Sequence, residues 1–423
     1  MRKLVLILLI VPWTQMPPSA QAGGEVLKWE DCVDLLWKNN PKLKSSEHNV
    51  TASQFGVTKA RAGYFPNVTA SGTIKRYQDT SSTTKGINSS QTYTGKTTVE
   101  VFSGFETFAT VRESQATLER SQAVLSQAKV SLLSDLRQAW AHALYAQENV
   151  KLSEKIEKRL KKNSNFLKLR YGGGLEARWT WEKADADWKE ALWEYEKAQA
   201  ELKVAIKKLG SVLGLKAIED FSVSGDFSVP EAPQLEAFRA SVLDLHPDIK
   251  YQYFQKEISH ATIQKEKSGL WPTVSLFADY SFKGVNEPPQ KKAWSYGLEF
   301  SWALFSGLET YAATREAREN YIKNDFTLQD TVLTIDSELK DAYTSYHYAK
   351  EKIAITKAKL DAARARARVV EEEYSSGLKN FLDWEQSQSL LTQAEKQHLT
   401  TERDALVALA DFEKARGMEL PSQ

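Results

Sequence analysis

The chain is poor in cysteine and histidine, which build disulfides and many metal sites, and its positive and negative charges nearly cancel. It has a single cysteine, Cys32, in 423 residues, which excludes an intramolecular disulfide and predicts a small buried side chain among helix-forming neighbours. Its six histidines are scattered, with no pair at metal-ligand spacing on one helix. The formal net charge of +1 argues against a nucleic-acid partner. We therefore predict no metal, no cofactor and no enzymatic activity.

Long apolar runs are also missing. Beyond the first residues, no stretch approaches the roughly 18 consecutive apolar residues of a transmembrane helix. Residues 1–22 have the layout of a secretory signal peptide, with basic Arg2 and Lys3, an apolar run at 4–11 and small residues before a cleavage site after Ala22. An uncleaved anchor is the alternative. An exported chain without a helical anchor is expected in the periplasm, in an outer membrane or outside the cell.

Two windows of 66 residues, 105–170 and 308–373, contain neither glycine nor proline. A continuous helix of that length would be roughly 100 Å long, far beyond the usual helix of about three turns. Each window is followed by a glycine-containing turn, where a left-handed backbone would close the helix. A second helix then returns at about 175–213 and 378–416, so the sequence predicts two long antiparallel helical hairpins.

The chain also contains an internal repeat, with an offset of about 203 to 206 residues. The repeated residues are Asn40-Pro41 with His246-Pro247, Phe65-Pro66 with Trp271-Pro272, Phe102-Ser103-Gly104 with Phe305-Ser306-Gly307, Tyr171, Gly174 and Leu175 with Tyr374, Gly377 and Leu378, and Trp181-Glu182 with Trp384-Glu385. Such a unit is too long for a solenoid. We predict a first structural repeat at 23–213, a linker at 214–233 and a second repeat at 234–423.

Each repeat is expected to contain a helix, two strands and a long helical hairpin. We expect His246 to begin a helix, as Asn40 does in the first repeat. We expect Trp181 and Trp384 to pack between the hairpins, and the neighbouring Glu182 and Glu385 to pair across them.

Four segments have the character of strands, at 68–77, 93–102, 274–282 and 296–305. In the last of them Leu298, Phe300 and Trp302 alternate with polar or small residues. About ten alternating residues are what a tilted strand needs to cross an outer membrane, with the apolar side outward. A half-buried sheet in a soluble protein is the alternative. The turn-rich stretches 79–90 and 284–290 would be exposed loops between the paired strands.

Four strands cannot close a barrel, and an open sheet edge cannot persist in lipid. If the strands cross a membrane, several chains must therefore share one barrel. Three chains would supply twelve strands, enough for an aqueous lumen, and six helical hairpins side by side.

At this point the chain resembles a known family, the TolC-like outer-membrane efflux proteins. The resemblance covers nearly the whole mature chain and depends on the internal duplication, the two Phe-Ser-Gly turns and the two Tyr-x-x-Gly segments, together and in this order. It implies a mainly α fold with transmembrane β strands, in which a homotrimer forms a 12-stranded β-barrel continued by a periplasmic α-helical barrel. It implies contact with outer-membrane lipid, and partners in the form of a periplasmic adaptor (membrane fusion) protein and an inner-membrane transporter of the RND, ABC or MFS type.

The resemblance also assigns roles to matching residues. Phe102, Ser103, Gly104 and their repeats Phe305, Ser306, Gly307 would form the strand-to-helix turns. Tyr171, Gly174, Leu175 and their repeats Tyr374, Gly377, Leu378 would lie at adaptor-docking hairpin tips.

The closed entrance of the family carries acidic residues on the helix after the second tip. Here the first position is Asp383 and the second is Gln386, which carries no charge, so the number of acidic rings stays open. Three copies of Asp383 around an axis would repel one another and bind cations. The alternative is that Asp383 is an exposed helical residue near a tip.

The function predicted from these features is a passive outer-membrane exit duct for efflux or secretion, gated at the hairpin tips and including type I secretion among its candidate pathways. The alternative is a periplasmic or surface coiled-coil scaffold without a pore. That alternative explains the long helices and the export signal, but not the four alternating strands.

Overall fold

The computed structural model describes residues 26–78, 87–215, 221–231, 234–284 and 291–418. The predicted signal peptide lies outside these residues, as does most of each predicted loop between paired strands. Within the described part, no helix combines the length and the apolar character needed to cross a bilayer.

Both halves have the same order of elements. The first half contains α1 (Trp29–Asn39), α2 (Pro41–Arg61), β2 (Asn67–Gln78), β3 (Ile87–Ser103), α3 (Glu106–Gly172) and α4 (Arg178–Leu213). The second contains α5 (Leu235–Leu245), α6 (Pro247–Glu266), β5 (Thr273–Gly284), β6 (Lys291–Ser301), α7 (Glu309–Ser375) and α8 (Phe381–Ala415). Short 3-10 helices, η1 (Ala62–Tyr64) and η2 (Lys267–Leu270), precede the strands, and β1 (Val26–Leu27) pairs in parallel with β4 (Ser222–Val223) inside the predicted linker.

The prediction of one helix before each strand pair was wrong, because each half has two. The residue before a proline is driven out of the helical conformation, so the chain turns at Asn40 and His246. The side chains of both residues then cap the next helix. Asn40 Oδ1 accepts from the Lys42 amide at 2.8 Å, and His246 Nδ1 accepts from the Asp248 amide at 3.3 Å. His246 therefore begins a helix as predicted.

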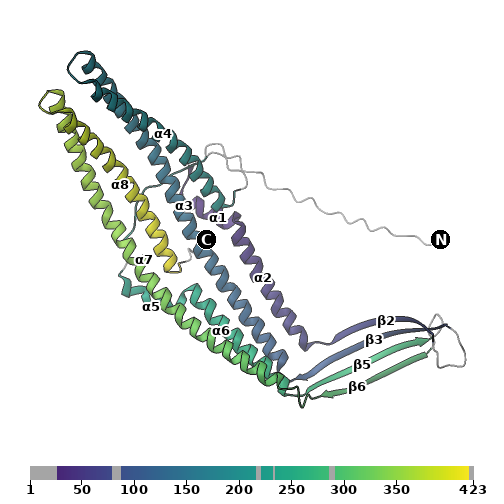
Figure 1. Cartoon of the computed structure of the whole chain (residues 1–423). Coiled ribbons are helices and arrows are strands. Elements are labelled where there is room, and N and C mark those ends of the chain that lie inside the picture. Colours follow the sequence, from purple (N-terminus) through teal and green to yellow (C-terminus); the bar gives the residue numbers. More distant parts are fainter. Residues whose placement is uncertain (1–25, 79–86, 216–220, 232–233, 285–290, 419–423) are drawn as a thin grey trace, which may run out of the picture.

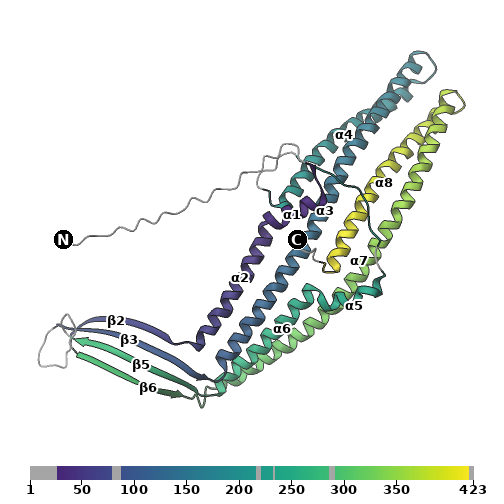
Figure 2. The same ribbon diagram turned by 180° about the vertical axis from the view of Figure 1, so that it is seen from behind.

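The molecule is elongated, with the sheet at one end and the two hairpin tips at the other (Figures 1 and 2). The long helices α3 and α7 have 67 residues each and run most of this length, as the glycine- and proline-free windows predicted. α4 folds back on α3 and α8 on α7, while α2 and α6 pack beside the part of α3 nearer the sheet.

The four long strands form one antiparallel sheet in the order β2-β3-β5-β6, so the β3–β5 pair joins the two halves. Register places Leu276 opposite Leu298, and Tyr280 opposite Trp294, on one face. The same face continues through Tyr93 of β3 to Gly72 of β2. The other face is mainly polar, and there the Ser295 hydroxyl bonds to Asp279.

The strand boundaries differ from those predicted. β3 begins at Ile87, earlier than expected, because turn-like Ser and Thr residues pair with β2. β6 ends at Ser301, so Trp302 and Phe305 of the predicted strand lie beyond it.

The largest apolar core lies where α1 packs against α3 and α4, and it includes Leu36, Leu136 and Trp140. Cys32 is fully buried in it, as predicted. Burial raises the pKa of the Cys32 thiol to about 12, so this cysteine is an inert core side chain.

Candidate functional sites: the strand-to-helix turns and the hairpin tips

The Phe-Ser-Gly segments form two nearly identical turns at the sheet end of the long helices. Gly104 has φ +63° and Gly307 +64°. The residues that follow, Phe105 and Leu308, are also left-handed, both at φ 71°. Two successive left-handed residues bend the chain between the strand and the long helix, and the motif serine lies beside the first turn of that helix. The Ser103 hydroxyl lies 3.1 Å from that of Thr107.

The surroundings of the two turns differ. A Cβ on Gly104 would lie 2.6 Å from the Ser268 carbonyl oxygen, and the Phe105 ring packs edge-on against Trp271 at 6.2 Å. The second half thus covers the turn of the first half. At Gly307 no atom of the described residues lies within 4 Å of the same position, and Leu308 is 68% exposed.

The Tyr-x-x-Gly segments close the far ends of α3 and α7. Gly174 has φ +72° and Gly377 +81°, as predicted for helix C-termini. In the first tip the Leu175 amide donates to the Arg170 carbonyl at 2.9 Å, and in the second the Leu378 amide donates to Glu373 at 2.8 Å. Both tips therefore use the same backbone hydrogen bonds to end the helix.

The repeated tyrosine and tryptophan of each tip stack on one another. The Tyr171 ring lies 5.9 Å from Trp181 at 11° between planes, and Tyr374 lies 4.9 Å from Trp384 at 17°. Trp384 is buried between the hairpins and Trp181 packs against the same apolar cluster, as predicted. Tyr171 is partly exposed, but Tyr374 is 2% exposed.

A polar contact links the two tips. The Tyr374 hydroxyl donates to Glu176 Oε1 at 2.5 Å. Arg170 lies 3.5 Å from the same carboxylate and over the Tyr374 ring. Burial and this hydrogen bond both raise the pKa of Tyr374, so it stays a protonated donor throughout the physiological range. Sequence reasoning missed Glu176 and Arg170, and the only signal for them was their position on either side of the first tip glycine.

Further charged contacts join the hairpins. Glu385 lies 3.8 Å from Lys183 on α4, so its predicted pairing across the hairpins is confirmed. The same prediction for Glu182 was wrong, because Glu182 pairs with Arg178 one turn away on its own helix, at 2.7 Å. Glu395 on α8 is a contact that the sequence did not indicate. Its buried carboxylate forms an ion pair with Arg159 of α3 at 3.0 Å.

Asp383 lies in the first turn of α8, where its backbone amide donates to the capping Asn380 side chain at 2.9 Å. Asp383 is half-buried and Gln386, one turn on, is exposed. Within the described residues the Asp383 carboxylate makes no ion pair. The described part of the chain also holds no group of three His, Cys, Asp or Glu side chains placed to bind a metal.

The fold defines a class of protein in which two long helical hairpins extend from one end of an antiparallel sheet, in two repeats of one plan. A family model described as "Outer membrane efflux protein" matches residues 32–215 and 239–418. The chain therefore belongs to the outer membrane efflux protein family.

Individual relatives are distant. Nodulation protein T of Rhizobium leguminosarum bv. trifolii is 22% identical over 410 residues, covering 90% of this chain and 87% of that protein. The alkaline protease secretion protein AprF of Pseudomonas aeruginosa is 22% identical over 314 residues, covering 72% and 65%. Among solved structures, the outer-membrane channel OprN superposes with a TM-score of 0.77 at 22% identity, covering 92% of this chain and 89% of that one.

These findings confirm the TolC-like fold and the outer-membrane location. They also favour an efflux or secretion channel over the pore-less coiled-coil scaffold.

Proposed function

We propose that three copies of this chain form one passive exit duct, which receives its cargo from an inner-membrane transporter of the RND, ABC or MFS type through a periplasmic adaptor. The energy for transport would come from that transporter. The names of relatives support export in general, since AprF is named an alkaline protease secretion protein and OprN an outer-membrane channel.

The observation that carries the proposal is the uncovered second turn. By the internal repeat, Leu308 corresponds to Phe105, and Phe65 corresponds to the Trp271 that covers Phe105. Phe65 is 68% exposed, as is Leu308. If a neighbouring copy packs on this chain as the second half packs on the first turn, its Phe65 would contact Leu308. The same contact between each pair of neighbouring copies would close a ring.

The sheet supports the same arrangement. Its edge strands β2 and β6 have unpaired backbone groups, which a neighbour's β6 and β2 would satisfy. On the apolar face Trp294, Tyr296 and Leu298 are each more than 60% exposed. A large apolar surface of this kind is expected to contact lipid once the barrel is closed.

The hairpin tips offer the surface for the adaptor. Leu175 is 70% exposed and Leu378 is 78% exposed, at the end of the molecule farthest from the sheet (Figure 1). Exposed apolar side chains at an extremity suit a docking contact. Because Tyr374 is buried, its part would be to position the tip, with Tyr171, Gly174 and Gly377 shaping the turns.

Opening would require the tips to separate. The Tyr374–Glu176 hydrogen bond and Arg170 would hold the closed state, and Asp383 would form an acidic ring at the constriction, with Gln386 one turn away. Like charges in a narrow passage bind cations, which would block the closed passage.

Single-channel conductance in a planar bilayer tests the proposal. Purified protein should give discrete steps, and Asp383→Ala should raise leak conductance or weaken block by multivalent cations. Steps that are unchanged by Asp383→Ala would support the duct and contradict the assignment of Asp383 to a gate. Folded protein that gives no steps would contradict the duct itself.

A further inference from the structure

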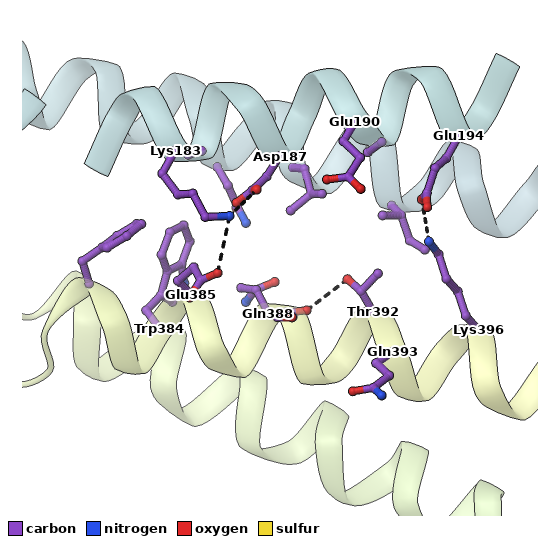
Figure 3. A pocket seen from close by; sticks show the side chains of 17 residues that line it. Lys183, Asp187, Glu190, Glu194, Trp384, Glu385, Gln388, Thr392, Gln393 and Lys396 are labelled. Atoms are coloured by element: carbon purple, nitrogen blue, oxygen red, sulfur yellow. Dashed lines mark hydrogen bonds and ion pairs between the residues drawn. The ribbon is translucent and has the colours of Figure 1, made fainter. Parts of the chain in front are cut away.

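A cavity of about 440 Å³ lies between the two hairpins of one chain, on the sheet side of the tips (Figure 3). α3 contributes Ile156 and Leu160, and α4 contributes the stretch from Lys183 to Glu194. α8 contributes the stretch from Phe381 to Lys396. The volume falls in the range of small-molecule sites, roughly 300–1,000 Å³. None of the Asp383, Gln386 or turn residues lines this cavity.

The lining carries an excess of negative charge. Its carboxylates are Asp187, Glu190, Glu194 and Glu385, and its ammonium groups are Lys183 and Lys396. Lys183 lies 2.5 Å from Asp187 and 3.8 Å from Glu385, and Lys396 lies 2.5 Å from Glu194. Both lysines are therefore committed to carboxylates. Glu190 makes no ion pair or hydrogen bond within the described residues, and its carboxylate points into the space between the helices (Figure 3).

Two buried polar atoms in the lining also lack a hydrogen-bond partner among the residues that the structure describes. Gln388 is 6% exposed, and its Oε1 accepts no hydrogen bond from them. Trp384 is 4% exposed, and its Nε1 donates none to them. The two residues lie one turn apart on α8, and the Gln388 side chain lies between α8 and α4 (Figure 3). Buried polar groups are nearly always hydrogen-bonded, so unpaired ones in a cavity indicate a missing partner.

We propose that this cavity binds a small organic cation, with an ammonium or guanidinium group on a short aliphatic chain. The cationic head would donate to the Glu190 carboxylate and to Gln388 Oε1, from opposite walls of the cavity. The aliphatic part would pack on Ile156, Leu160 and Ala191. Trp384 Nε1 would donate to a water or to an acceptor atom of the ligand.

Such a ligand would bridge α4 and α8, and so would bind the two hairpins of one chain to each other. It would act alongside the Lys183–Glu385 and Glu194–Lys396 ion pairs, which already cross between these helices. Because every lining residue belongs to one chain, binding does not depend on closure of the ring.

Calorimetric titration of spermidine into the detergent-purified full chain tests the site. The Asp383→Ala variant serves as the background, so that cations held at the proposed constriction add no heat. We expect saturable binding at one site per chain. Glu190→Gln removes a charged acceptor without changing shape and should weaken binding about tenfold. Gln388→Glu adds a negative charge and should strengthen binding.

Glu196→Gln is the matched control, because Glu196 is exposed on the same helix but does not line the cavity. It should bind spermidine as the background does, and an uncharged α,ω-diol of the same length should not bind. Absence of saturable binding would overturn the proposal. Equal affinity for spermidine in Glu190→Gln and in the background would also overturn it. So would equal losses of affinity in Glu190→Gln and Glu196→Gln, because that result would show attraction to net charge alone.

Discussion

Single residues determine the backbone conformation of the two turns at the sheet end of the long helices. Gly104 combines a left-handed backbone with a close approach to the Ser268 carbonyl, and only a residue without a Cβ satisfies both. The need for glycine was visible in the sequence because the Phe-Ser-Gly segment occurs twice. The identity of the covering residue was not, since Ser268 lies in the other half of the chain.

Gly104→Ala should therefore destabilise the fold. The left-handed backbone alone costs about 1–2 kcal/mol for a residue with a Cβ, and the contact with Ser268 adds to that cost. Gly95→Ala is the control, because Gly95 lies in β3 with open space around its Cβ position. Thermal denaturation in detergent should show a clear fall in the midpoint for Gly104→Ala and little change for Gly95→Ala. Equal midpoints would show that the turn is not under this constraint.

Glu413 on α8 predicts a pH dependence of stability. Burial raises its pKa above the usual 4.5, although Arg137 at 2.7 Å acts in the opposite direction. A raised folded-state pKa means that the contribution to stability is complete below the unfolded pKa and is lost as the pH rises through the folded pKa. As the pH rises from below 4.5, Glu413→Gln should therefore lose less stability than the wild type. Parallel pH profiles of the melting temperature would contradict this assignment.

At the scale of elements, the long helices followed directly from the absence of glycine and proline in two windows. The strands followed from alternation, but their ends did not. β6 stops at Ser301 although the alternation continues through Leu304, because β5, its partner within the chain, ends its pairing there. Contacts between elements were the least predictable part. Tyr374 and Glu176 are 198 residues apart, and no local pattern relates them.

The ion pair between α3 and α8 should contribute strongly to the packing of the hairpins. The Glu395 side chain is 3% exposed and holds Arg159, which is 20% exposed. Removing one partner of a buried pair leaves the other charge uncompensated, at a cost of about 3 kcal/mol. Glu395→Ala should show a loss of this size in denaturation. Glu148→Ala removes an exposed partner of Lys151 and should change stability by less than about 1 kcal/mol; similar losses in both variants would contradict the distinction.

The contact between the two tips should control opening. Tyr374→Phe removes the hydroxyl that donates to Glu176 but keeps the ring stacked on Trp384. A hydrogen bond to a charged group contributes about 1.5–3 kcal/mol, so the open state should become roughly ten times more populated or more. Single-channel recordings should show a higher open probability. Tyr171→Phe is the control, because Tyr171 makes the same ring stack in the other tip, and no hydrogen bond of its hydroxyl is seen among the described residues. Unchanged gating in Tyr374→Phe would exclude the contact as a restraint.

At the scale of the whole molecule, one chain has three uncovered features within the part that the structure describes. Its sheet ends in two edge strands, its second turn is uncovered, and aromatic side chains of β6 are exposed. Counting strands in the sequence predicted that several chains would share one barrel, since four strands cannot close a barrel in lipid. It did not predict which residues would meet between copies of the proposed ring. The proposed contact of Phe65 with Leu308 was inferred from the first turn, where Phe105 and Trp271 show how one half covers the other.

Cross-linking between copies tests ring closure most directly. In a Cys32→Ala background, Phe65→Cys and Leu308→Cys in one chain should react through a short bifunctional thiol reagent to give covalent dimers and trimers, and nothing larger. Phe105→Cys with Trp271→Cys is the control, and it should link only within one chain, because those two residues are in contact there. Monomers alone from the Phe65/Leu308 pair, or a ladder that continues beyond three copies, would contradict a closed trimeric duct.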